Sequence, residues 1–393
     1  MNALRKYFDK IKPNFQEGGK LHAFRSLYDG FDTFAFVPNT TAGRVGTHIH
    51  DAIDSKRIMS LVVIALVPAL LFGMYNVGYQ NALAAGQLEN ATFWGIFFYG
   101  FLAVLPKLIV SYVVGLGIEF TVAQWKGEEI HEGFLVSGII IPMIIPVNTP
   151  LWILAVAVAF SVIFAKEIFG GTGMNIFNVA LITRAFLFFS YPTAMTGDDT
   201  VWIAQDTILG LGYAVPDTFT AATPLGELAA GGAVSSCICS QIYGLIPGSV
   251  GETSVIAIAL GALLLLCTGV ASWKTILSVF VGGALTAMLF DATLSPENVG
   301  AHIPWYQHLV LGGFCFGAVF MATDPVTSAR TECGKWIYGF LIGFVAITVR
   351  VLNPGYPEGM MLAILLMNAF APLIDYVFVS RNISRRAKRL TSK

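Results

Sequence analysis

The most constraining feature of the sequence is a series of long apolar blocks that begins near residue 58. A helix needs roughly 20 apolar residues to cross the hydrocarbon core of a bilayer. Hydrophobic residues make up 55% of the 393 residues and charged residues only 12%, whereas an ordinary soluble domain has roughly 25% charged residues. We therefore expect a multi-pass membrane protein, which excludes a soluble enzyme and a disordered chain.

The apolar blocks fall into two sets of five. The first set covers residues 58–76, 94–120, 134–147, 151–168 and 178–191, and the second covers 254–272, 275–291, 306–322, 336–352 and 359–379. Backbone polar groups inside a bilayer must be hydrogen-bonded within the protein, and helices satisfy this requirement within one segment. The sequence thus predicts an all-α integral membrane protein with about ten transmembrane helices.

Short, interrupted segments stand at matching places in the two sets. The third block ends at residues 146–150 (PVNTP), and the eighth ends at residues 324–328 (DPVTS). Five spans per half would give the halves opposite orientations, and broken helices at corresponding positions are typical of inverted repeats. We therefore expect two inverted five-helix repeats, with a coincidence between two Pro-Val pairs as the alternative.

The distribution of Lys and Arg indicates the topology. Nine of the 23 basic residues lie in residues 1–57 and six in residues 381–393, while residues 192–253 contain none. Basic flanks are retained in the cytoplasm, so both termini are predicted to be cytoplasmic. The predicted parts are a cytoplasmic docking segment (1–57), a first half (58–192), an extracytoplasmic loop (193–253), a second half (254–380) and a basic cytoplasmic tail (381–393).

Several residue types that carry chemistry in other proteins form no recognisable site here. The five cysteines are too scattered for a metal-ligand cluster or a disulfide framework. His48 and His50 are more typical of a docking segment than of a metal site, since further ligands are lacking. The basic ends are explained by membrane topology and need no nucleic-acid partner. We therefore expect no metal centre.

The predicted external loop contains a stretch rich in threonine. Asp217 and Thr220 precede two alanines, Thr223 and a proline. The small residues leave the Thr223 hydroxyl accessible. Taken alone, this stretch is typical of an ordinary turn, although such a hydroxyl can also accept a phosphoryl group. The loop also carries six carboxylates, among them Glu252, and no Lys or Arg to pair with them.

A glycine-rich segment, residues 170–178 (GGTGMNIFN), lies between the fourth and fifth blocks. Glycines allow close approach of the backbone, and the Asn175 and Asn178 amides offer donors and acceptors. Taken alone, the segment predicts a helix break, because it lacks the lysine of a phosphate-binding loop.

Three segments together resemble the B subunit of the Na⁺-translocating NADH:quinone oxidoreductase family, over essentially the whole chain. Residues 217–223 are similar to the Asp-x-x-Ser/Thr-Gly-Ala-Thr signature at which a flavin transferase attaches FMN to threonine through a phosphoester. The glycine-rich segment and residues 31–34 (FDTF) with 51–57 (DAIDSKR) also resemble that family. Ala221 departs from the pattern, because the family usually has glycine there.

The resemblance implies two flavins, a quinone site and a cation pathway. FMN would be attached to Thr223, within the motif that includes Asp217 and Thr220, and a noncovalent riboflavin would lie near the glycine-rich segment. The implied riboflavin contacts are Gly170, Gly171, Thr172, Gly173, Asn175 and Asn178; the implied quinone contacts are Gly133 and Glu132; and the implied cation residue is Asp375.

The function implied by the resemblance is that of a redox subunit in a bacterial inner membrane. Electrons would pass from a covalent FMN on the C subunit through the FMN and riboflavin to ubiquinone or menaquinone, while Na⁺ moves outward. The implied partners are the other subunits of a six-subunit complex, a flavin transferase, the quinone and the lipid bilayer. NADH oxidation is assigned to a different subunit, because no dinucleotide-binding βαβ pattern is present.

Two alternatives remain open from the sequence. One is the D subunit of the related ferredoxin:NAD⁺ electron-transport complex, although the long segment before the first span favours the B subunit of the Na⁺-translocating family. The other is a solute channel or secondary transporter without a redox role, since inverted repeats and broken helices suit such proteins equally well.

Overall fold

The computed structural model describes residues 2–16, 19, 21, 24–36, 45–46, 55–127, 133–195, 202–215, 222–295, 298–353, 355–356 and 358–391. Within these ranges every regular element is a helix, and the only β-type pairing is an isolated bridge between Ile208 and Leu211. The prediction of an all-α architecture is confirmed.

The first set of predicted blocks forms five consecutive helices. A π-helical turn (Val162–Lys166) and a 3-10 turn (Glu167–Phe169) extend the fourth of them. The five helices are α3 (Ser55–Ala84), α4 (Phe93–Lys126), α5 (Phe134–Ile144), α6 (Leu151–Ser161) and α7 (Val179–Ser190).

The second set is helical too, but one of its members is broken. The helices are α10 (Val255–Cys267), α11 (Trp273–Thr293), α12 (Trp305–Val310), α13 (Phe314–Phe316) with the π-helical turn η9 (Gly317–Met321), α14 (Glu332–Leu352) and α15 (Met360–Thr391). The block at residues 306–322 is therefore not one continuous helix. The chain turns at Gly312, whose φ of 63° lies in the left-handed region that glycine adopts without strain.

Six helices of the described chain are long and apolar enough to cross a membrane. They are α3, α4, α6 with its two extending turns, α11, α14 and α15. Three further apolar helices, α5, α7 and α10, have only 11, 12 and 13 residues. Short helices leave backbone ends inside the membrane region, where those ends must line a cavity or bind another part of the protein.

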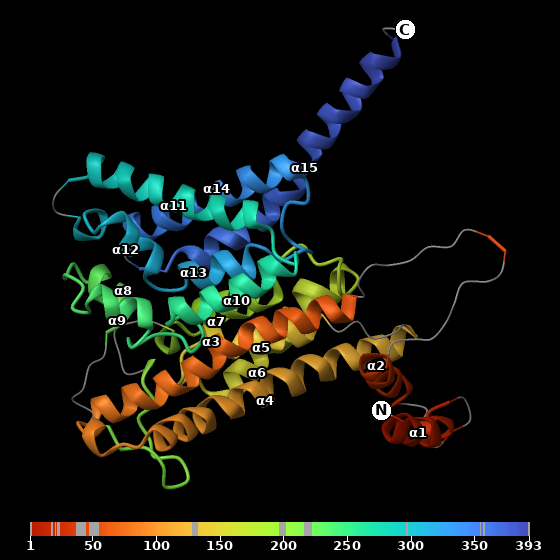
Figure 1. Cartoon of the computed structure of the whole chain (residues 1–393), viewed down its shortest axis with the longest axis horizontal. Coiled ribbons are helices and arrows are strands. Elements are labelled where there is room, and N and C mark those ends of the chain that lie inside the picture. Colours follow the sequence, from red (N-terminus) through yellow and green to blue (C-terminus); the bar gives the residue numbers. More distant parts are fainter. Residues whose placement is uncertain are drawn as a thin grey trace.

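The main helices run lengthwise across Figure 1, and the two ends of the bundle differ. Helices α1 (Asn2–Ile11) and α2 (Arg25–Ala35) lie at the same end as the C-terminal part of α15, whereas α8 (Pro224–Ala229) and α9 (Ile238–Tyr243) lie at the opposite end. Both termini are thus at one end of the bundle, as an even number of crossings requires. Which end faces the cytoplasm stays a prediction.

Glycines allow close helix packing in each half. A side chain at Gly100 of α4 would collide with the Met74 carbonyl of α3, and one at Gly343 of α14 would collide with the Val279 carbonyl of α11. Small residues at such crossings let backbones approach where lipid gives no hydrophobic drive for association. These contacts fix the long helices as a frame for the shorter ones.

The two halves share part of their packing pattern. Helix α4 packs on α5 and α6, as α11 packs on α12 and α14, and α6 packs on α7 as α14 packs on α15. Helices α3 and α10, the first of each half, pack on each other across the molecule. This correspondence supports a repeat, while the opposite orientation of the halves stays a prediction.

Candidate functional site

Two cavities lie where the halves meet. We call the first the inner cavity; it has a volume of about 80 Å³ and lies beside the glycine-rich segment. The second, the outer cavity, has a volume of about 240 Å³ and borders α8. Each contains residues singled out in the sequence.

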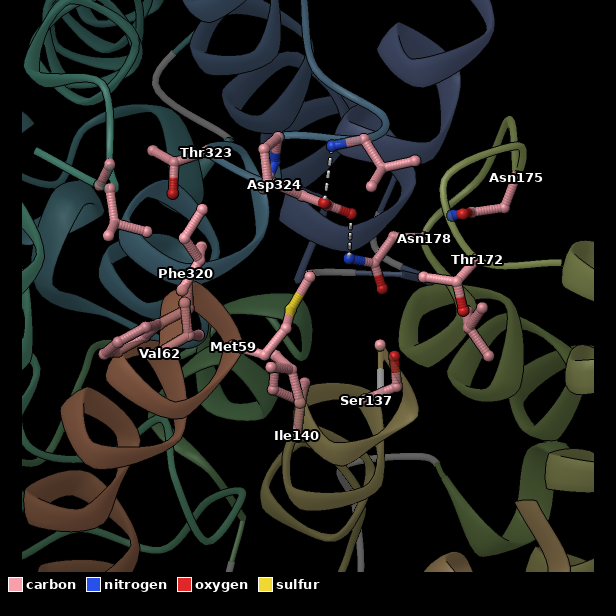
Figure 2. Close-up of a pocket in the computed structure, with 18 of the residues that line it drawn as sticks. Met59, Val62, Ser137, Ile140, Thr172, Asn175, Asn178, Phe320, Thr323 and Asp324 are labelled. Atoms are coloured by element: carbon pink, nitrogen blue, oxygen red, sulfur yellow. Dashed lines mark hydrogen bonds between the residues drawn. The ribbon is translucent and has the colours of Figure 1, made fainter. Parts of the chain in front are cut away.

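The inner cavity brings together residues predicted for two different ligands. Gly133 lines it together with Thr172, Asn175 and Asn178, and Figure 2 shows these three side chains on one side of it. A Cβ atom at Gly133 would lie 2.6 Å from Thr172 Cγ2, so the absence of a side chain permits this approach. The predicted quinone and riboflavin positions are therefore neighbours.

The glycines of the segment have a different role, which is to shape the backbone. Gly170, Gly171 and Gly173 have φ values of 114°, 93° and 90°. This left-handed backbone carries the chain around the break between α6 and α7. None of the three lines the inner cavity.

Asn178 links the two halves of the molecule. Its Oδ1 caps the start of α7 by accepting from Ala180 N at 3.0 Å, and its Nδ2 donates to Asp324 Oδ2 at 3.2 Å (Figure 2). Asp324 also accepts from Val326 N and Thr327 Oγ1, each at 3.0 Å. Asp324 was noted in the sequence as part of a break but not as a site residue.

A buried ion pair adjoins the inner cavity. Lys166, which lines the cavity, pairs with Glu119 of α4, and each side chain is only 4% exposed. Lys166 ends the π-helical turn, a local feature that is frequent at functional sites. Sequence reasoning missed Glu119, because it is a single carboxylate near the end of a long apolar block.

The outer cavity borders the Thr223 hydroxyl. Thr223 precedes α8, and its Oγ1 accepts from Gly226 N at 3.1 Å, which caps the helix. Pro224 occupies the first helical position, where its missing N–H is not needed. Thr223 is partly exposed and lines the cavity. Asp217, Thr220 and Glu132 lie outside the described residues.

Three charged side chains, Arg184, Glu252 and Glu358, line the outer cavity, and we call them the outer charge cluster. Arg184 of α7 donates to Glu252 Oε1 at 3.0 Å and also binds Glu358 Oε2. It further donates to the Ile144 carbonyl at the end of α5. The external loop has no cation of its own for Glu252, and the fold supplies one from a helix 68 residues away.

Four buried polar atoms of the outer cavity have no hydrogen-bond partner. They are Arg184 Nε, Trp202 Nε1, Thr253 Oγ1 and Glu358 Oε1. Buried polar atoms are paired in the great majority of cases, so each such group requires an explanation. Four of them around one cavity indicate a site for a polar ligand.

Asp375 of α15 lies apart from both cavities. Its Oδ2 accepts from Arg330 N at 2.7 Å, and its Oδ1 accepts from Thr331 N at 2.9 Å and Thr331 Oγ1 at 2.6 Å. The carboxylate therefore anchors the start of α14. Its predicted part in a cation pathway stays a prediction.

Comparison with known proteins identifies the family. A profile described as the NQR2, RnfD, RnfE family matches residues 43–384. The chain belongs to this family. Its similar relatives include proteins named as the B subunit of Na(+)-translocating NADH-quinone reductase. The protein of Chromohalobacter salexigens is 45% identical over 98% of this chain and 96% of its own length, and that of Ectopseudomonas mendocina is 41% identical over 98% and 99%.

A relative of the same name from Klebsiella pneumoniae is 42% identical, again over 98% of this chain and 99% of its own length. The family resemblance inferred from the sequence is thus confirmed over the whole chain. The family also includes RnfD proteins by its description, whereas these three relatives are all named as B subunits of the Na⁺-translocating reductase.

Proposed function

We propose that this chain is the B subunit of a Na⁺-translocating NADH–quinone reductase and carries FMN on Thr223. Full-length similarity to proteins of that name supports the assignment. The charge distribution and the position of both termini at one end of the bundle support cytoplasmic termini, and similarity to the named relatives supports placement in a bacterial inner membrane. The proposed partners are the remaining subunits, above all the FMN-bearing C subunit, and a flavin transferase that attaches the FMN.

The observation that carries the FMN proposal is the position of Thr223 beside the outer cavity. Its hydroxyl is partly exposed, and the cavity behind it contains four buried polar atoms without partners. The volume of about 240 Å³ approaches the roughly 300–1,000 Å³ of small-molecule pockets. The buried polar atoms without partners and the nearly sufficient volume support a flavin beside Thr223.

In this proposal the phosphate is held by Thr223, and the apolar walls are formed by Phe188, Trp202 and Tyr356. A bound flavin supplies one- and two-electron transfer. The chain's own contribution is to orient the ring, exclude water and provide the charges of the outer charge cluster.

The inner cavity has polar groups suited to a second flavin but too little room for one. Its amide and hydroxyl groups have the chemistry to bind the edge of a riboflavin ring. Its volume of about 80 Å³ is far below the roughly 300 Å³ of the smallest typical ligand pockets. The residues therefore do not fit riboflavin in this conformation.

Family membership supports the remaining assignments. We propose Gly133 and Glu132 as contacts of ubiquinone or menaquinone, and Asp375 as a residue of the Na⁺ pathway. Gly133 lines the inner cavity between the two halves, and because the volume there is only about 80 Å³, we propose that it contacts part of the quinone and does not enclose the whole ligand.

Fluorescence of the denatured chain under ultraviolet light in a gel tests the proposal. The wild-type chain is expected to fluoresce, because a phosphoester survives denaturation, and Thr223→Ala is expected to be dark. Thr223→Ser is the matched control, since it keeps a hydroxyl at the same position. A dark wild-type chain from cells that contain the flavin transferase would refute covalent attachment and favour a transporter without a redox group.

A further inference from the structure

The outer charge cluster contains two carboxylates for one guanidinium. The side chains of Arg184, Glu252 and Glu358 are only 5%, 6% and 12% exposed. With both carboxylates ionised, the cluster would hold one negative charge without compensation. A buried, uncompensated charge is expensive enough that such a group usually becomes neutral instead.

A second buried guanidinium lies beside the cluster. Arg350 of α14 is the next guanidinium, and it donates to the carbonyl oxygens of His308, Leu311 at 3.1 Å and Glu358 at 3.4 Å. Its positive charge offsets part of the excess and lowers the pKa of Glu358, but its hydrogen bond to Glu358 is to the backbone carbonyl and not to the carboxylate. Among the described residues, one other titratable group, Tyr356, faces the cluster directly. Two more, His308 and Cys315, lie on the far side of Arg350. None of these three supplies a positive charge near neutral pH.

The two carboxylates converge on a single small space. A Cβ atom at Gly313 would lie 2.8 Å from Glu252 Oε1 and 3.0 Å from Glu358 Oε1, so the two oxygens are no farther apart than the sum of these distances. Glu252 Oε1 is engaged by Arg184, whereas Glu358 Oε1 has no partner. Two carboxylates that share one site rarely ionise together.

The pKa shifts of the two carboxyl groups agree with a shared proton. Both residues lie outside the membrane-spanning helices, in the segments before α10 and α15. Burial raises the pKa of Glu358 to about 8, and it also raises the pKa of Glu252, while Arg184 opposes the rise in both. At neutral pH the pair is thus expected to be half neutralised.

We propose that Glu252 and Glu358 share one proton, held at Glu358 Oε1, and that this proton site is coupled to the charge of the group bound in the outer cavity. The coupling rests on the proposed function, whereas the shared proton does not. An electron delivered to the cavity by a one-electron donor would strengthen proton binding by the pair, and the proton would enter from water at the α8 end. By linkage, a protonated pair favours the reduced group by the same free energy.

The shared proton can be tested without any flavin. Infrared spectra of the Thr223→Ala chain in lipid nanodiscs are expected to contain the carbonyl band of a protonated carboxylic acid at neutral pH. The band should disappear as the pH rises, and it should be lost in Glu358→Gln. Glu252→Gln serves as a second variant in case the first does not fold.

The matched control is Glu227→Gln, because Glu227 is a partly exposed carboxylate of α8 that accepts hydrogen bonds from Ser235. This change should leave the band unaltered. A band that is absent at neutral pH, or that persists in both variants of the pair, would overturn the proposal. Loss of the band on adding Na⁺ at constant pH would also overturn it, since the pair would then be a cation site.

The coupling is tested by redox titration of the covalent flavin in the intact complex at a series of pH values. Uptake of one proton per electron changes the midpoint potential by about 59 mV per pH unit. The wild type is expected to show an additional slope of up to this size compared with Glu358→Gln, and the variant should have the higher potential at alkaline pH. Identical profiles in the presence of the infrared band would overturn the coupling alone. Absence of flavin would refute the proposed function and leave the infrared result standing.

Discussion

Replacing Arg184 with methionine is expected to destabilise the protein strongly at neutral pH and weakly at acidic pH. The guanidinium has two buried carboxylate partners and one carbonyl partner. In the proposed state one of the two carboxylates is already protonated and the other is ionised. Without the guanidinium, the ionised carboxylate must either stay buried and unpaired or take up a proton. Protonation is the less expensive route.

The expected loss of stability in Arg184→Met depends on the pH. A glutamate has an ordinary pKa of about 4.3, and each pKa unit corresponds to about 1.36 kcal/mol, so protonating one carboxyl at pH 7 costs about 4 kcal/mol. This agrees with the roughly 3–5 kcal/mol lost when one partner of a buried ion pair is removed. At pH 5 the same protonation costs only about 1 kcal/mol.

The direction of the pH effect follows from linkage. The remaining carboxyl has a folded-state pKa above its unfolded value, so the folded state binds more protons than the unfolded state. The stability that this carboxyl contributes to the variant is fully present below the unfolded-state pKa and is lost as the pH rises. The deficit of Arg184→Met should therefore shrink by about 3 kcal/mol between pH 7 and pH 5.

Unfolding of the protein in lipid nanodiscs or detergent, measured at both pH values, provides the test. Arg184→Met/Glu252→Gln should recover most of the loss at pH 7, because the double variant lacks the ionised carboxylate. Arg330→Met is the control for a basic residue at the surface, and a change there should stay within about 0.5 kcal/mol. An equal deficit at pH 5 and pH 7 would refute the reasoning.

Three further changes test other parts of the structure. Asn178→Ala removes both the cap of α7 and the bond to Asp324, so we expect a loss of about 1–3 kcal/mol in unfolding measurements; wild-type stability would contradict the described cap. Gly133→Ala places a methyl group against Thr172, which should raise the KM for quinone without changing the flavin content; an unchanged KM would argue against quinone at the inner cavity. Asp375→Asn loses part of the anchor of α14, worth about 1–2 kcal/mol. If Asp375 also belongs to the Na⁺ pathway, the Na⁺ concentration for half-maximal activity should rise as well, and an unchanged value would restrict it to anchoring.

Hydropathy was sufficient to predict the helical segments but not their breaks. All ten predicted blocks are helical, because long apolar runs in a membrane have few other solutions. The break at Gly312 escaped notice, since Gly312 and Gly313 do not lower the hydropathy of their block enough to signal a turn. A glycine's backbone conformation depends on its neighbours in space, which hydropathy does not capture.

The candidate site was predictable where a local motif existed. Thr223, Thr172 and the two asparagines could be named from short sequence patterns, and all four border cavities. The pairing of Arg184 with Glu252 and Glu358 left no such signal. The partners come from separate segments, and only the packing of α7 against the loops before α10 and α15 brings them together.

Mass spectrometry of the peptide that contains Thr223 tests the central claim most directly. The chain is purified from cells that express the flavin transferase. The account predicts a peptide heavier than its sequence by the mass of FMN less one water, with fragment ions that place the addition on Thr223. An unmodified peptide, or FMN on another residue, would contradict it.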